Sequence, residues 1–349
     1  MATTDTGARP ATRTPTARAH TLRLIGLLVA GGALAFVFML SIAVGTRDIS
    51  LATAWRVLWE PDGSTESVII HDLRIPRALL GVVVGAATGL AGALMQALTR
   101  NPLADPGLFG VNMGASAAIV VGIAFLGVSS ISGYVWFAFA GAAAASVGVY
   151  LLGSSGRSSA TPERLALAGA AMTAVLYAFI SAVMLLNIEV FNKFRFWNVG
   201  SLVGRDLDVL WQVLPFLVVG LLITFGLARP LNALALGEQA AASLGARVGL
   251  TRVLGAVAVM LLCGASTAAI GPIAFVGLAV PHAARLIVGP DQRWVLPYSM
   301  VLAAILLLGS DVVGRLFSDT EEVQVGIVTA IIGAPVFILL CRRRKLARL

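Results

Sequence analysis

The chain has 349 residues, of which 58% are hydrophobic and only 12% are charged, and its mean hydropathy is +0.92. Soluble proteins carry about 25% charged residues, so this composition excludes a pair of soluble domains and indicates a polytopic membrane protein. The net charge of +8 is explained by basic cytoplasmic loops, which membrane proteins favour, and we predict no nucleic-acid partner.

The first 22 residues are rich in Ala, Thr and Arg and precede a long apolar run. That run, 24–44, exceeds the roughly 7–15 apolar residues of a signal peptide. We therefore predict a disordered cytoplasmic tail over 1–22 and a retained first membrane helix. A cleaved signal peptide is the alternative interpretation.

Ten apolar runs in the sequence are candidates for membrane helices, because crossing about 30 Å of hydrocarbon takes about 20 apolar residues. The long uncharged stretch between Arg252 and Arg285 is divided at the Gly271-Pro272 step, since proline cannot continue the helical hydrogen bonds. We predict an all-α polytopic membrane protein with a ten-helix domain over 23–341. The spans are 24–44, 79–98, 107–128, 131–153, 165–187, 209–228, 253–271, 273–289, 295–316 and 325–341.

Charge placement supports ten spans with both termini in the cytoplasm. In that topology 17 of the 25 basic residues and only 5 of the 17 acidic residues lie on the inner side, as the positive-inside rule requires. Fusing the seventh and eighth spans would place the basic tail 342–349 outside. We therefore expect a basic cytoplasmic tail there.

The sequence lacks several kinds of chemistry. No predicted span carries a carboxylate near its middle, which disfavours an ion-coupled secondary carrier. No G-x-x-x-x-G-K-[ST] phosphate loop occurs, so any ATP that drives transport is bound by another chain. The three histidines, His20, His71 and His282, fall in separate parts of the topology. This scatter predicts neither a catalytic residue nor a metal site.

Two loops carry unusual residues. At 71–77 the run H-D-L-R-I-P-R places Arg74 and Arg77 around Pro76 on the outer side. These arginines are either snorkelling side chains or a docking point for an acidic partner. On the inner side, 229–252 predicts two short helices bounded by Gly237 and Gly245. That loop is either a connector or the surface against which an ATPase acts.

A set of motifs in the chain resembles the FecCD family, the permeases of ABC importers for iron chelates and cobalamin. The first block is R-I-P-R, G-A-L-M-Q and R-N-P-L-A-D-P-G between residues 74 and 107. The second is G-P-I-A-F-V-G-L-A-V-P-H-A-A-R at 271–285, followed by D-V-V-G-R at 311–315 and V-G-I-V-T-A-I-I-G-A-P-V-F at 325–337. The resemblance runs in order from about residue 45 to residue 340.

The resemblance implies the type II ABC importer permease fold and a set of partners. They are an identical or homologous permease subunit, two cytoplasmic ATPases that hold ATP and Mg, and a periplasmic protein or lipoprotein that binds the substrate. It also implies site residues. Docking to the binding protein falls to Arg74, Arg77 and Arg315, and ATPase coupling, within 231–245, to Gly237, Glu238, Ala241, Leu244 and Gly245.

The transport pathway is less clearly marked. Spans two and three are dense in small residues, which permit close helix contacts, and Met95, Gln96, Gly114 and Ser116 are candidates for the pathway wall. The chain departs from the family at Gln324, where a proline usually precedes the last helix. The aromatic side chains in 188–206 are interpreted as interfacial anchors, with a siderophore cage as the alternative.

The expected function follows from these features. We expect a transport subunit and not an enzyme, with no cofactor on this chain, in the bacterial cytoplasmic (inner) membrane. The expected cargo is a ferric siderophore. Haem or cobalamin is the alternative within the family, and an ion-coupled secondary carrier is the alternative outside it.

Overall fold

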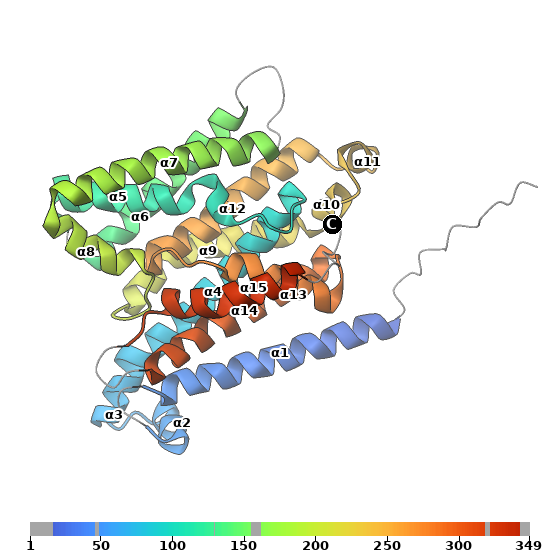
Figure 1. Ribbon diagram of the computed structural model, residues 1–349. Coiled ribbons are helices and arrows are strands. Elements are labelled where there is room, and N and C mark those ends of the chain that lie inside the picture. Colours follow the sequence, from blue (N-terminus) through green and yellow to red (C-terminus); the bar gives the residue numbers. More distant parts are fainter. Residues whose placement is uncertain (1–16, 46–48, 129, 155–161, 318–321, 343–349) are drawn as a thin grey trace, which may run out of the picture.

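The computed structural model describes residues 17–45, 49–128, 130–154, 162–317 and 322–342, and within them every regular element is helical. Figure 1 shows the helices gathered in one bundle. The helices are α1 (Ala17–Ala43), α2 (Leu51–Trp59), α3 (Thr65–Val68), the π-helical η1 (Ile69–Arg74), α4 (Ile75–Thr99), the 3₁₀ turn η2 (Pro106–Phe109), α5 (Val111–Leu126), α6 (Ile131–Ser154), α7 (Pro162–Leu186), α8 (Ile188–Asn198), α9 (Leu207–Gly226), α10 (Ala228–Leu234), α11 (Glu238–Ser243), α12 (Val248–Ile270), α13 (Val276–Val288), α14 (Gln292–Leu316) and α15 (Val325–Arg342).

The ten predicted membrane spans all coincide with helices, so the fold class is confirmed. Seven of the helices in the described ranges are long and apolar enough to cross a bilayer, and three shorter apolar helices, within α5, α13 and α15, complete the set. The first helix starts at Ala17, inside the segment expected to be a disordered tail. Residues 1–16 of that tail and 343–349 of the basic C-terminal tail lie outside the described residues.

The break predicted between the seventh and eighth spans is present. Helix α12 ends at Ile270, Gly271 takes a φ of +85°, and α13 begins only at Val276. The residue before α13, Phe275, has a φ of +66°, a left-handed conformation that bulky residues seldom adopt. The chain therefore crosses this level of the bundle as irregular backbone, which membrane proteins tolerate only inside protein or beside a cavity.

Helix α4 lies at the centre of the bundle, in contact with α9, α12, α13 and α14. Nearly all of its residues from Leu80 onwards are buried. Helix α1 lies along α14 at the margin of the bundle (Figure 1). It exposes large apolar side chains such as Leu28 and Val29, and so does α7 with Leu185 and Leu186. Such surfaces suit lipid or a second membrane subunit.

Glycines on α4 allow its backbone to approach two neighbouring helices. A Cβ added at Gly85 would lie 2.7 Å from the Cα of Ala304 on α14, and one added at Gly92 would overlap the backbone of Gly277 on α13. The hydrophobic effect does little to drive helix association within lipid. Small residues at helix crossings stabilise the association instead, because they allow the two backbones to approach and make dispersion contacts. The small-residue content of this span therefore reflects helix packing.

Replacing Gly92 with Ala is expected to destabilise the bundle by about 1–3 kcal/mol, because the methyl group overpacks the contact with α13. The measurement is unfolding of the purified chain in mixed detergent micelles. Gly31→Ala on α1 is the matched control, since no atom lies within 4 Å of the added Cβ and alanine is the better helix former. Equal stability of the two variants would contradict the packing argument.

Candidate functional site

The start of α4 carries two arginines on either side of Pro76. Pro76 lies where the continuous helical stretch Thr65–Thr99 changes from the π-helical η1 to α4, and its ring nitrogen cannot donate a helical hydrogen bond there. Arg74, the last residue of η1, donates from Nη1 to the carbonyl oxygens of Ile42 and Ala43, each at 2.6 Å. These carbonyls belong to the C-terminal end of α1, where a cation is favourable and the helix leaves acceptors open.

Arg77 holds two acidic side chains. Its Nε and Nη2 donate to Asp311 at distances of 3.0 and 2.7 Å, and its Nη1 donates to Glu322 at 2.5 Å. The paired geometry on Asp311 is the bidentate arrangement that makes arginine–carboxylate contacts strong. Glu322 keeps a side-chain exposure of 20% and Asp311 only 1%. A partner protein could therefore contact Glu322, whereas Asp311 is enclosed by this chain.

Arg315 shares Asp311 with Arg77. It donates to the Asp311 carboxylate from one helical turn further along α14. It also donates to the carbonyl oxygens of Ser41 at 2.7 Å and Val44 at 3.1 Å. Together, Arg74 and Arg315 occupy four consecutive carbonyls at the end of α1. One buried carboxylate and three arginines thus join α1, α4 and α14.

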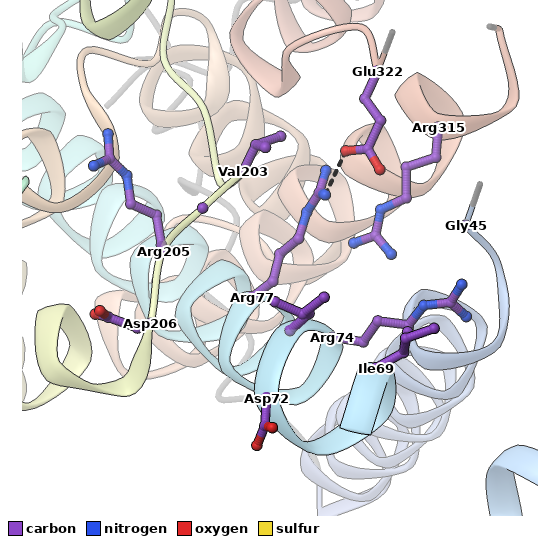
Figure 2. Close-up of a pocket in the computed structure, with 12 residues that line it drawn as sticks. Gly45, Ile69, Asp72, Arg74, Arg77, Val203, Arg205, Asp206, Arg315 and Glu322 are labelled. Carbon is purple, nitrogen blue, oxygen red and sulfur yellow. Dashed lines mark hydrogen bonds and ion pairs between the residues drawn. The ribbon is translucent and has the colours of Figure 1, made fainter. Parts of the chain in front are cut away.

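The three predicted docking arginines are therefore brought together at one end of the bundle, around a cavity of about 390 Å³. Figure 2 shows Arg77 and Glu322 as an ion pair with Arg315 beside them and Arg74 nearer to Gly45. Each of the three is at most 9% exposed and already has partners within the chain. Their role in docking stays a prediction. We call Arg74, Arg77, Asp311, Arg315 and Glu322 the outer ion cluster.

Sequence reasoning did not include Asp311 and Glu322 among the site residues. The signal for Asp311 was present, because an acid and an arginine four residues apart lie on the same face of a helix. The pairing with Arg77 spans 234 residues of sequence, and spacing along the chain does not reveal such a contact.

The residues predicted to couple to an ATPase lie at the opposite end of the bundle, where Figure 1 shows α10 and α11. Two short helices are present there, as expected. Gly237 before α11 has a φ of +103° and Gly245 after it has a φ of +82°, conformations that glycine adopts without strain. Ala241 is fully buried, whereas Leu244 is 67% exposed.

Glu238 fixes α11 to the following membrane helix. Its carboxylate accepts a hydrogen bond from Arg252 near the start of α12. The backbone N–H of Ala246 donates to the carbonyl of Ala241 at 2.9 Å. The backbone bond closes the C-terminal end of α11, the Glu238–Arg252 pair joins α11 to α12, and Leu244 is presented to the outside.

The four pathway candidates are not brought together at a surface. Met95 and Gln96 are buried side chains of α4. The side chain of Gln96 donates a hydrogen bond to the carbonyl of Leu278 at 3.1 Å and accepts one from Arg285. Gly114 packs its backbone against Gly141 of α6. Ser116 is 1% exposed. All four belong to the packed interior of this chain.

A groove of about 450 Å³ lies elsewhere, beside the break between α12 and α13. Its lining includes three polar residues, Asp105, Asn112 and Asn198, together with the strained Phe275. Burial raises the pKa of Asp105, which lies in the loop after α4, and a hydrogen bond from the N–H of Gly107 opposes that shift. Sequence reasoning missed this groove because its residues come from four separate segments.

Comparison with known proteins places these features in context. The profile of the FecCD transport family matches residues 33–343. The chain is 44% identical over 314 residues to the probable siderophore transport system permease protein YfiZ of Bacillus subtilis, covering 89% of this chain and 94% of that protein. It is 47% identical over 306 residues to the ferric enterobactin transport system permease protein FepD of Escherichia coli, with coverages of 87% and 91%.

A solved structure gives the same result for the fold. The solved protein is of the metal-chelate type ABC transporter class and is in an inward-facing conformation. Its structure matches that of this chain with a TM-score of 0.79 at 27% sequence identity. The match covers 90% of this chain and 98% of that one.

Replacing Asp311 with Asn is expected to destabilise the chain by about 3–5 kcal/mol, because the buried guanidinium of Arg315 loses its anion and that of Arg77 keeps only Glu322. Unfolding in mixed detergent micelles measures the effect. Glu189→Gln on α8 is the control, since Glu189 pairs with Lys193 on the exposed surface, where an ion pair contributes little. If both variants unfold alike, Asp311 does not hold the cluster together.

Proposed function

Because the chain belongs to the FecCD transport family, we propose that it is the membrane-spanning subunit of an importer that takes up an iron chelate, a ferric siderophore. The match to the family over residues 33–343 is the observation that carries this function, and it confirms the resemblance seen in the sequence. The names of the relatives YfiZ and FepD support an iron-siderophore cargo.

The complete importer in this proposal contains a second permease subunit, identical or homologous, and two ATPases. ATP and Mg are bound by the ATPases, and this chain carries no cofactor. A substrate-binding lipoprotein or periplasmic protein delivers the cargo. The assembly lies in the bacterial cytoplasmic membrane with both termini of this chain inside, an orientation supported by the excess of basic residues on that side.

Docking of the binding protein in this proposal uses the outer ion cluster. Arg77 holds Glu322 through Nη1 alone, while Asp311 occupies its other nitrogens. An acidic residue of the binding protein can replace Glu322 at Nη1 without exposing an unpaired buried charge. Docking therefore becomes an exchange of one carboxylate for another, which favours a reversible contact.

Force from the ATPases enters through α11. The exposed Leu244 supplies an apolar contact for a soluble partner, and the Glu238–Arg252 pair passes displacement of α11 to α12. No group within the pathway has to react with the cargo. The chain acts by alternating the access of a central cavity to the two sides of the membrane.

Uptake measured in cells tests this function. A strain that lacks the gene is supplied with radiolabelled iron as a ferric siderophore, as haem, or with labelled cobalamin. We expect the chain to restore siderophore-dependent uptake, and a partner ATPase with its phosphate-loop lysine replaced to abolish it. Restored uptake of haem or cobalamin alone would reject the cargo. Uptake that persists without ATP hydrolysis would indicate an ion-coupled carrier.

Leu244→Asp is expected to reduce chelate uptake at least tenfold, because it places a charge in the contact with the ATPase. Pull-down of the ATPase by the tagged permease and uptake in cells are the two measurements. Trp59→Asp on α2, at the other end of the bundle and outside the predicted spans, is matched in exposure, at 69% against 67% for Leu244, and we expect it to keep ATPase association. Loss of association in both variants would show a general folding defect.

A further inference from the structure

A second pocket lies beside the cavity of the outer ion cluster and shares Val203 and Arg205 with it. It has a volume of about 290 Å³ and is lined by residues of α6, α8, the segment after α8 and the residue before α15. Its members include the aromatic side chains Tyr134, Phe196 and Trp197 and the basic side chains Lys193 and Arg205. We call it the aromatic–basic pocket.

Three polar atoms that line this pocket are buried without a hydrogen-bond partner among the described residues. They are Nε1 of Trp197, Nε of Arg205 and Oε1 of Gln324. Trp197 is 4% exposed and Arg205 is 9% exposed. Buried polar groups are ordinarily satisfied, and leaving one unsatisfied costs about 1–3 kcal/mol. Three such atoms around one pocket indicate a polar ligand.

Arg205 is not part of the outer ion cluster. Figure 2 shows its side chain directed away from the Arg77–Glu322 pair, on the far side of Val203. Burial lowers the pKa of Arg205, against the charge of neighbouring Asp206. A buried guanidinium needs an anion, and the guanidinium of Arg205 lines the aromatic–basic pocket.

The chemistry of the lining selects one kind of ligand. The N–H of Trp197 and the guanidinium of Arg205 suit a group with negatively charged oxygens, while Lys193 lies beside them in its ion pair with Glu189. The three rings suit a flat aromatic group. A ferric complex of three catecholates has both, because its phenolate oxygens carry more negative charge than iron neutralises. A ferric trihydroxamate lacks the charge and the rings, and a citrate complex lacks the rings.

We propose that the aromatic–basic pocket binds one arm of a ferric tris-catecholate chelate on the outer side of the membrane. One arm is the right scale, because 290 Å³ lies at the lower limit of sites for small ligands. This inference rests on the proposed function and specifies the class of cargo.

Direct binding tests the inference. The importer complex in nanodiscs, without its binding protein, is titrated with a radiolabelled ferric tris-catecholate and, separately, with a ferric trihydroxamate. We expect the catecholate to bind, and Arg205→Gln to weaken its binding about tenfold, the loss of one charge-assisted hydrogen bond. Trp197→Phe, which keeps a ring and removes the N–H, should weaken it several-fold.

Arg56→Gln is the matched control. Arg56 lies on α2 at the same end of the bundle and is exposed, so the variant removes the same charge away from the pocket and should bind as wild type does. Association with the ATPases, measured by gel filtration, establishes that each variant is folded. The inference is overturned if wild type binds the two chelates equally or if Arg205→Gln binds the catecholate as tightly as wild type does.

The uptake assay separates this inference from the proposed function. If cells take up a trihydroxamate through this chain and the catecholate does not bind, the pocket assignment is wrong and the importer function stands. If no ferric chelate is taken up, the proposed function itself fails. An effect of Arg205→Gln on docking of the binding protein, with binding of the free catecholate unchanged, would instead assign the pocket to protein docking.

Discussion

One buried carboxylate organises the end of the bundle that carries the three predicted docking arginines. Asp311 accepts hydrogen bonds from Arg77 of α4 and Arg315 of α14, and Arg315 in turn occupies carbonyls at the end of α1. Because these side chains are buried, removing one of them leaves a buried charge without its partner and destabilises the fold. The arginines that the family resemblance assigned to docking therefore also hold three helices in register. A binding protein that contacts this cluster contacts the framework itself.

The ten membrane helices and the short helices of 229–252 were predictable because each depends on local information. Long apolar runs produce membrane helices whatever their partners, and Gly237 and Gly245 mark the ends of α11 by their backbone conformation alone. The pairing of Arg77 with Asp311 depends on a contact across 234 residues, which no local pattern contains. The sequence therefore predicted the positions of the arginines and left their partners undetermined.

The pathway candidates show a different limit of sequence reasoning. Small residues on α4 and α5 were compatible with a pathway wall and with helix packing, and Gly92 and Gly114 lie at backbone crossings. Asn112 and Asn198 line the groove beside the α12–α13 break, and neither stood out in the sequence, because the residues of this groove come from separate segments of the chain.

Helix α12 connects the two ends that function requires. It begins beside α11, where Arg252 holds Glu238, and the carbonyl of its last residue, Ile270, accepts a hydrogen bond from the N–H of Ser201 at 2.7 Å. Ser201 lines the aromatic–basic pocket. A helix transmits displacement along its axis because its backbone hydrogen bonds resist compression, and packed elements of this kind carry coupling between sites. One continuous helix therefore joins the α11 loop to the segment that lines the aromatic–basic pocket, and the irregular backbone from Gly271 to Phe275 separates it from α13.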